Sequence, residues 1–177
     1  RAMDDVIIAA ATGTAYTGET GATTESAQTA IAASVGSTTG LNIPKIAKAK
    51  QLLDVADVDP SIARHIIVSP EQINNLLNVT EVTSADFNTV KALVHGEIDT
   101  FLGFKFTVSN RLAKSGNDRT IIAYAEDGIA LAVGKDISAR IDERADKSYA
   151  TQVYYCQTIG ATRMEQAKVV PITCTEA

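Results

Sequence analysis

The period of the hydrophobic residues changes along this chain, from helical spacing in the first half to alternation in the second. Between residues 42 and 94, apolar side chains recur at intervals of three and four residues, which is typical of amphipathic helices. From residue 104 onward, apolar and polar residues alternate in several stretches, which indicates strands with one buried face. Helices followed by a run of strands predict an α+β fold with an antiparallel sheet.

Two helix starts stand out in the first half of the chain. Asn42 and Pro44 suit the cap and the first turn of a helix over residues 44–56. Its core-facing residues are expected to be Ile46, Ala49, Leu52, Leu53 and Ala56, and its solvent-facing residues Lys45, Lys48, Gln51 and Asp54. Ser69 and Pro70 likewise begin a helix over residues 70–78, preceded by a short buried strand over residues 65–68.

A third helix is expected after residue 83, because Thr83 and Asp86 resemble a capping box. Its inward residues are expected to be Phe87, Val90, Leu93 and Val94. Gly96 then ends the helix.

The first 40 residues differ in character from the rest. Residues 1–11 have the pattern of the last turns of a helix already under way, so we expect further sequence upstream of Arg1. Residues 12–40 contain no Lys, Arg or Asp and are dominated by Thr, Gly and Ala. So long a stretch predicts a loop, either a weakly ordered connection or a functional element.

The second half of the chain is expected to supply the strands. They are predicted over residues 104–108, 120–124, 137–142, 149–159 and 168–172. Residues 128–133 are apolar and fit either a helix or a strand. We expect a central sheet with helices packed on it and an elongated arm formed by the terminal strands.

The composition excludes several classes of protein. The 177 residues carry a net charge of −5 and no basic stripe that could neutralise phosphates, which argues against direct DNA binding. No apolar run approaches the roughly 18 residues that span a bilayer, and two cysteines cannot form a disulfide scaffold. Aromatic residues make up only 5% of the chain, which disfavours stacking platforms for single-stranded nucleic acid.

No catalytic constellation emerges from the ionisable and nucleophilic residues. His65 and His95 lie on different expected elements, and neither belongs to a spaced ligand motif. Cys156 and Cys174 each fall in a strand pattern, where a buried cysteine acts as a small hydrophobic residue; a disulfide between them or metal binding is the less favoured alternative. We therefore predict no catalytic residue, no cofactor and no metal site.

Residues 135–147 are unusual because charges of both signs alternate densely. The charged residues of this segment are Lys135, Asp136, Arg140, Asp142, Glu143, Arg144, Asp146 and Lys147. One interpretation is an exposed hairpin with a solvated face. The other is a contact between subunits, since mixed charges specify register and partner better than they add affinity. Exposed pairs contribute only ~0–1 kcal/mol each, so such a contact would need many copies of the chain to matter.

Five stretches of the chain, taken in order, resemble one known family. They are residues 1–8 (RAMDDVII), the helix 44–56 with residues 63–77 (ARHIIVSPEQINNLL), residues 96–98 (GEI) with 102–110 (LGFKFTVSN), residues 127–132 (DGIALA), and residues 149–163, which end in GATR, with VVPI at 169–172. Together they resemble the C-terminal part of the major capsid protein of tailed double-stranded-DNA phages, which has the Hong Kong 97-type fold.

The resemblance implies an α+β fold of this type that lacks the N-terminal arm and the extended loop. Residues 1–24 would be the end of the spine helix and the exit loop of the peripheral domain. Residues 25–147 would form the axial domain, and residues 148–177 the return strands of the peripheral domain. The implied function is structural and not enzymatic: a subunit that self-assembles into an icosahedral head enclosing double-stranded DNA.

The implied partners are copies of the chain itself in hexamers and pentamers, scaffold, portal or decoration proteins, and packaged DNA bound non-specifically, with no membrane. The implied location is the virion, with the host cytoplasm during assembly. Two alternatives stay open. One is an encapsulin-type nanocompartment shell of the same fold. The other is a small-ligand-binding or enzymatic α+β domain with a cleft under residues 12–40, which a convergent set of ionisable groups in a pocket would favour.

Overall fold

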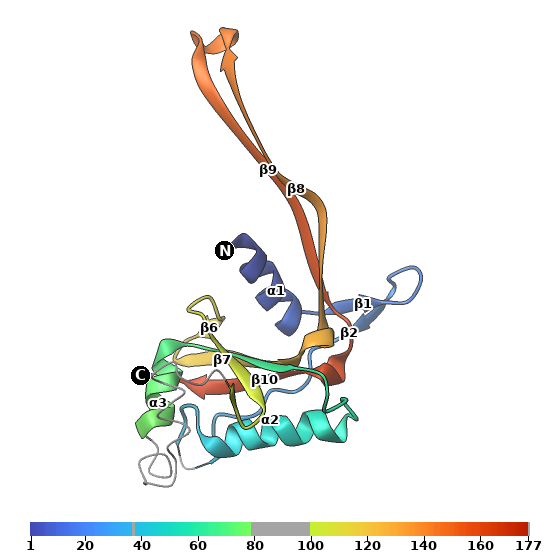
Figure 1. The fold of residues 1–177 in the computed structure, drawn as a ribbon, viewed down its shortest axis with the longest axis vertical. Helices are drawn as coiled ribbons and strands as arrows, with labels where there is room; N and C mark the ends of the chain where they lie inside the picture. The colour runs from blue at the N-terminus through green and yellow to red at the C-terminus, as the bar shows by residue number, and fades with distance from the viewer. Residues whose placement is uncertain (37, 79–99, 177) are drawn as a thin grey trace.

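The molecule consists of a body built on a six-stranded sheet and a two-stranded arm that projects far beyond it (Figure 1). The structure is a computed structural model that describes residues 1–36, 38–78 and 100–176. The third helix expected from Thr83 to Gly96, with Phe87, Val90, Leu93 and Val94, lies outside the described residues, and so does His95.

The sheet of the body is mixed rather than antiparallel. Its strands are β3 (Arg64–Val68), β4 (Thr100–Phe101), β5 (Phe104–Val108), β6 (Lys114–Ser115), β7 (Asp118–Ala125) and β10 (Val169–Thr175). They lie in the order β10-β7-β3-β5-β4, with β6 paired to β7. β3 and β5 are parallel, with Ile66 opposite Phe106, whereas we expected antiparallel pairing throughout. Parallel neighbours need a long crossover connection, and the chain between residues 68 and 104 provides it.

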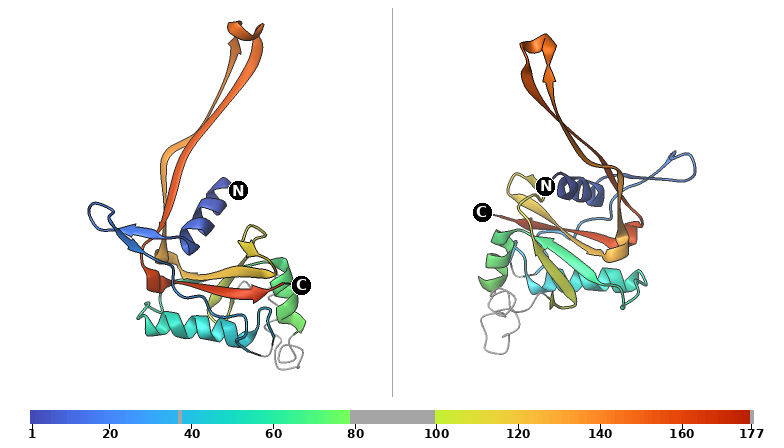
Figure 2. Two further views of the ribbon diagram at one scale, coloured as in Figure 1. Left: turned by 180° about the vertical axis from the view of Figure 1, so that it is seen from behind. Right: turned by 45° about the horizontal axis from the view of Figure 1, so that its top comes forward.

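Two helices cover opposite faces of this sheet, α1 (Ala2–Thr12) and α2 (Ile43–Val55), as the two further views show (Figure 2). A third helix, α3 (Pro70–Asn78), follows β3. The expected caps are confirmed, because the Asn42 side chain accepts a hydrogen bond from the Lys45 amide at 3.0 Å and the Ser69 hydroxyl accepts one from the Gln72 amide at 3.3 Å.

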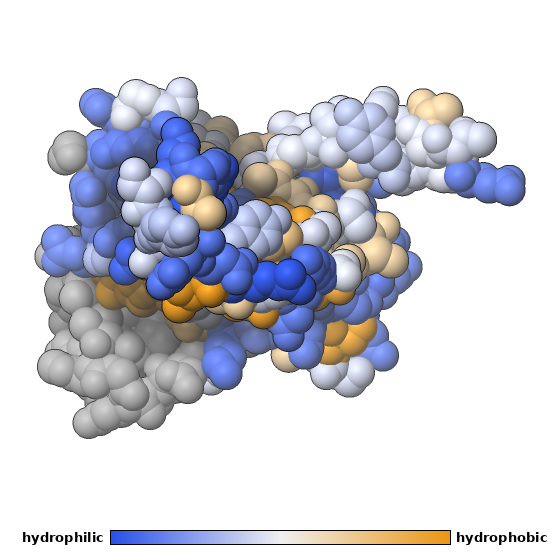
Figure 3. All heavy atoms as spheres, turned by 90° about the horizontal axis from the view of Figure 1, so that it is seen from above, coloured by the Kyte–Doolittle hydropathy of each residue, from blue (hydrophilic) through white to orange (hydrophobic). Residues whose placement is uncertain are grey.

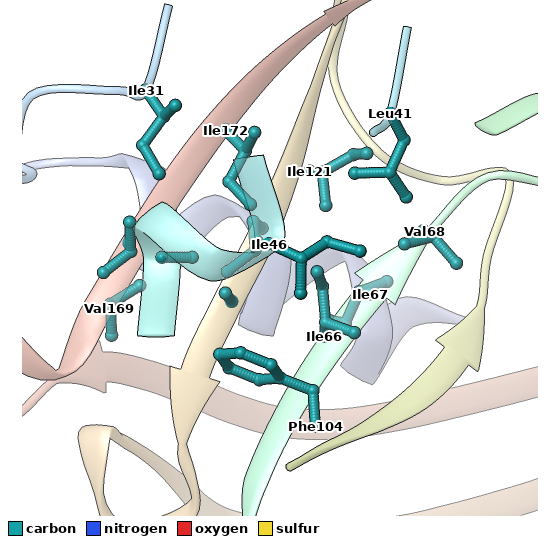
Figure 4. Close-up of a cluster of buried hydrophobic side chains, with 14 of the residues drawn as sticks. Ile31, Leu41, Ile46, Ile66, Ile67, Val68, Phe104, Ile121, Val169 and Ile172 are labelled. Atoms are coloured by element: carbon teal, nitrogen blue, oxygen red, sulfur yellow. The ribbon is translucent and has the colours of Figure 1, made fainter. Parts of the chain in front are cut away.

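The core lies between α2 and the sheet. Ile46, Ala49 and Leu53 are buried as predicted, whereas Leu52 and Ala56 are half-buried against the same core. Ile46 lies beside Ile66 of β3 and Phe104 of β5, and all three are fully buried (Figure 4). Apolar contact of this kind, rather than helix propensity, supplies most of the stability of a helix in a protein.

Lys45 corrects the predicted orientation of α2, because it is fully buried, although Lys48 is exposed as expected. The Lys45 ammonium donates to the carbonyl oxygens of Thr39 at 2.7 Å and Gly40 at 2.6 Å. These bonds compensate the cost of burying the charge, which would otherwise be prohibitive. Burial lowers the pKa of Lys45 below its ordinary value of 10.5.

The Thr- and Gly-rich stretch before α2 is more ordered than a plain loop. It contains a short hairpin of β1 (Ala15–Thr17) and β2 (Thr23–Glu25), whose turn includes Gly18 at a φ of 84°. Further along, Ile31 is buried and pairs with β10, its amide donating to the Pro171 carbonyl at 2.9 Å. The stretch therefore covers the outer edge of β10, which would otherwise be unpaired.

The arm is formed by β8 (Ile129–Arg144) and β9 (Ala150–Arg163), which pair along their length. Short 3₁₀ turns flank the two strands: η1 (Glu126–Gly128), η2 (Ala145–Lys147) at the tip, and η3 (Gln166–Lys168). Residues 129–133 belong to β8, which settles the helix-or-strand ambiguity in favour of a strand. β10 lies beside β7 in the body, so the expectation that the terminal strands together form the arm is wrong for β10.

Among the helices in the described ranges, none is long and apolar enough to cross a lipid bilayer.

Candidate inter-subunit interface on the arm

The charged segment singled out by the sequence lies entirely on the outer part of the arm. Lys135 to Arg144 lie on β8, and Asp146 and Lys147 lie on the tip turn η2. All eight charged residues of the segment are exposed. The structure therefore brings these residues together on one projecting element (Figure 1). That they contact another subunit stays a prediction.

The register between the strands gives the outer arm two different faces. Paired residues project on the same side of a ribbon, and successive residues project on opposite sides. One side carries the pairs Ser138–Cys156, Arg140–Tyr154 and Asp142–Gln152, which form the polar face. The other side carries Ala139–Tyr155 and Ile141–Val153, which form the apolar face, and the polar pair Glu143–Thr151 follows on the same side towards the tip.

The apolar face is open to solvent. Ile141 is 70% exposed, Val153 67% and Tyr155 61%. Fully burying one such side chain stabilises a contact by roughly 1.5–3 kcal/mol, against ~0–1 kcal/mol for one exposed ion pair. Burial of the apolar face in a contact would therefore contribute more to binding affinity than the exposed charges. Sequence reasoning missed it because its two halves lie on strands that only the register brings together.

Two of the charged residues at the tip of the arm pair with each other. The Arg144 guanidinium donates two hydrogen bonds to the Asp146 carboxylate, at 2.9 and 2.5 Å. This contact holds the pKa of Asp146 below its ordinary value of 3.8. Ser148 and Tyr149 follow with φ of 53° and 59°, which closes the turn into β9. Viewed from above the tip, polar surface is interrupted by separate apolar patches (Figure 3).

Arg163, at the end of β9, fixes the base of the arm. It is only 3% exposed, and its guanidinium donates to the carbonyl oxygens of Ala11 at 3.1 Å, Gly13 at 2.9 Å and Glu25 at 2.9 Å. These acceptors lie at the end of α1 and at the end of β2, so one side chain joins the helix, the hairpin and the arm. A cation is favourable at a helix C-terminus, and α1 has no basic residue in its own last turn.

The other end of α1 is tied to the body. The Asp5 carboxylate accepts two hydrogen bonds from the Arg111 guanidinium, which holds the pKa of Asp5 below its ordinary value. The two residues are 106 positions apart in the sequence, so no local pattern indicates that they pair. Helix α1 is therefore held at both ends, and the arm with it.

Two cavities of the body differ in the side chains that line them. A cavity of about 660 Å³ beside β3 is lined by four ionisable side chains, those of Lys50, Asp54, Asp57 and Arg64, and Arg64 pairs with Asp54 at 2.7 Å. A smaller cavity next to Gln28 and Thr29 is lined by no ionisable side chain. No cluster of three or more potential metal ligands occurs in the part of the chain that the structure describes.

His65 and the two cysteines lie in surroundings typical of residues with a structural role. The His65 ring stacks on Tyr124, with the ring centroids 5.4 Å apart. Cys174 is buried in the body, and burial raises the pKa of its thiol to about 11. Cys156 lies on the arm, and both cysteines are free.

Comparison with known proteins identifies the class of molecule. Residues 1–176 match the model of a family described as phage capsid protein, so the chain belongs to that family. No curated protein sequence matches the chain significantly.

Solved structures agree on the fold. The chain is similar to a structure from Mycobacterium phage Che8 (TM-score 0.65, 23% identity) over 97% of its own length and 58% of that chain. It is also similar to the capsid of Ralstonia phage GP4, with a TM-score of 0.66 and 9% identity, over 99% of its own length and 64% of that chain. It is similar to the cyanophage Pam1 capsid, with a TM-score of 0.65 and 15% identity, over 99% of its own length and 65% of that chain. The chain has the Hong Kong 97-type capsid fold expected from its sequence and spans about 58–65% of the length of these relatives.

Proposed function

We propose that this protein is a structural subunit of an icosahedral phage head that assembles with copies of itself, as hexamers and pentamers, into a shell around double-stranded DNA. The family match supports a phage shell over the encapsulin-type alternative. The absence of ionisable groups from the cavity beside Gln28 and Thr29 gives the ligand-binding or enzymatic alternative no support there.

The observation that carries this proposal is the arm. A two-stranded ribbon is marginally stable in water by itself, and this one exposes Ile141, Val153 and Tyr155 along one face. A monomer gains nothing from such a face, whereas neighbouring copies in a shell can cover it. The surrounding charges, including Lys135, Asp136, Arg140, Asp142, Glu143 and Lys147, would set the partner and register of that contact.

The proposal extends to the domains, the cargo and the other partners. Residues 1–24 and 148–177 were expected in the peripheral domain and residues 25–147 in the axial domain. Because β8 pairs with β9 and β10 pairs with β7, we propose that the whole arm goes with the peripheral domain and that β10 goes with the axial domain. A net charge of −5 suits a container that encloses DNA without gripping it. Scaffold, portal or decoration proteins would be further partners. The protein would assemble in the host cytoplasm and would afterwards be part of the virion.

The test is electron microscopy of the protein expressed from its complete gene. Closed shells are expected, and their absence at every protein and salt concentration that keeps the protein soluble overturns the proposal. Ile141→Asp should abolish shells without changing the melting temperature of the unassembled subunit. Val55→Asp is the matched control, because Val55 is equally exposed, at 74%, but lies on the body.

A further inference from the structure

The outer edge of β8 is a free strand edge with defined limits. Within the described residues, β8 pairs only with β9, so its other edge has unpaired backbone donors and acceptors. The pairing with β9 is irregular between Lys135 and Ser138, and η2 begins at Ala145. The regular part of the outer β8 therefore runs from residue 138 to residue 144, and its midpoint is Ile141.

We propose that two copies of the chain pair antiparallel through this β8 edge, about a two-fold axis that passes through Ile141. The proposal rests on the proposed function, since it names which surface two copies share in a shell. It would turn two separate ribbons into one four-stranded sheet, in the order β9-β8-β8-β9.

The charges of β8 fit this arrangement and no shift of it by one residue. With the axis at Ile141, Arg140 of each copy lies opposite Asp142 of the other, so the contact has two opposite-charge pairs. The other positions place Ser138 opposite Arg144 and Ala139 opposite Glu143, so no like charges face each other. An axis at residue 140 would place Arg140 opposite its own copy, and an axis at residue 142 would do the same to Asp142. Like charges directly opposite destabilise a strand pair.

The two faces of the arm are preserved by this symmetry. A two-fold axis normal to a sheet keeps the same face of both copies on the same side, so the apolar faces become continuous. Ile141 meets its own copy at the axis, with Val153 and Tyr155 of each copy flanking it. The combined sheet exceeds the two strands that are marginal in water. The combined apolar face has twice the area of one arm's and lies on one side of the four-stranded sheet, where a third element can pack against it.

The edge of β9 does not offer the same specificity. Residues 150–156 carry no charged side chain, so nothing on that edge selects one register over another. The charges on β8, in contrast, discourage pairing with unrelated strands and permit pairing with themselves.

Cysteine crosslinking tests the position of the axis. In a Cys156→Ser background, Ile141→Cys should give a disulfide-linked dimer of the 177-residue chain under mild oxidation, because paired residues at the axis have Cα atoms about 4.5–5.5 Å apart. Ala139→Cys is the control on the same strand and face, since its two copies would lie about 14 Å apart. A dimer from Ala139→Cys but not from Ile141→Cys, or equal yields from both, overturns the proposal.

Charge exchange tests the pairing itself. Arg140→Asp and Asp142→Arg should each weaken dimerisation about tenfold in sedimentation equilibrium, because each places two pairs of like charges in contact. The double variant, and an equimolar mixture of the two single variants, should restore it. Lys105→Glu, an exposed charge reversal on the body, should have no effect. Failure of the double variant and of the mixture to recover overturns the proposal.

The outcomes separate this inference from the proposed function. Closed shells from the complete gene without an I141C crosslink would mean that the subunits contact each other elsewhere, so the inference fails and the function stands. Crosslinked dimers with no shells under any condition would instead overturn the function and leave β8 pairing as a property of a dimeric protein.

Discussion

Arg163→Met is the sharpest test of how the arm is held. Methionine fills a similar volume but donates no hydrogen bond, so the carbonyl oxygens of Ala11, Gly13 and Glu25 lose their common donor. The substitution leaves every residue of the outer arm in place. It therefore separates the attachment of the arm from the chemistry of its tip.

The magnitude follows from the geometry. Three hydrogen bonds of 2.9–3.1 Å connect a buried cation to backbone oxygens, and a bond to a charged group contributes about 1.5–3 kcal/mol. Methionine also removes the cost of burying the charge, and water can reach the freed end of α1. We expect a net loss of about 3 kcal/mol in the free energy of unfolding. Arg163→Lys should lose about half of this, because one ammonium cannot span both Gly13 and Glu25.

Urea denaturation measures the loss, and hydrogen exchange locates it. Exchange should accelerate at the C-terminal turn of α1 and in β2, while the centre of α2 keeps its protection relative to global unfolding. Arg140→Met is the control, because Arg140 is exposed and its removal should change stability by less than about 0.5 kcal/mol. A loss below about 1 kcal/mol for Arg163→Met, or unchanged exchange in α1, refutes the assignment of Arg163 as the anchor.

Three further substitutions test the interior of the body. Glu176→Gln should cost about 1–3 kcal/mol at neutral pH, because it removes the negative charge that accepts from Arg119 at 2.7 Å and replaces one acceptor oxygen with a donor. Burial alone would raise the pKa of Glu176, but its hydrogen bonds lower it from 4.5 to about 2, so its contribution is complete above pH 4.5 and lost as the pH falls towards 2. The variant should therefore flatten the acid side of a stability–pH profile, and an unchanged profile contradicts the prediction. Lys45→Met should cost ~1–3 kcal/mol in urea denaturation by removing the ammonium donor from the Gly40 carbonyl and from the Thr39 carbonyl, which keeps the Thr175 amide as a donor, and a stabilised variant would contradict it. Leu53→Ala should cost ~2–5 kcal/mol in thermal denaturation because Leu53 is fully buried, and a shift equivalent to less than about 1 kcal/mol would count against it.

Local signals predicted the helices of the body well. Asn42 and Ser69 act as caps where the sequence placed them, and Ile46, Ala49 and Leu53 of α2 are buried. Lys45 was assigned to solvent because of its charge, although it precedes Ala49 by one helical turn and so belongs to the buried face. Its position near the start of α2 lets the ammonium reach back to the carbonyls of the preceding turn, and the sequence does not show where that turn lies.

Non-local pairing was harder to predict. The pattern of the strands predicted their existence, but the parallel pairing of β3 with β5 depends on the path of the chain between them. The interface was predicted from charges that are contiguous in sequence. Its apolar face combines Ile141 of one strand with Val153 and Tyr155 of another, and such a combination appears only after the register is known.

The two ends of the arm therefore do different physical work, and the variants can separate them. At the base, Arg163 acts within one chain and is buried, so its loss must appear in the stability of the unassembled subunit. At the outer end, Arg140 and Asp142 are exposed, so reversal of their charges must leave that stability unchanged and appear only in association.

An arm that binds a neighbouring copy also has to keep a fixed direction, because association requires the contact surfaces of the two copies to meet in one register. Loss of Arg163 should consequently weaken assembly as well as folding, and restoring the subunit's stability by working at lower temperature should recover only part of the assembly. If assembly recovered completely as soon as the subunit was folded, the base would be a stability element alone, and the direction of the arm would have to be set by the neighbouring subunit.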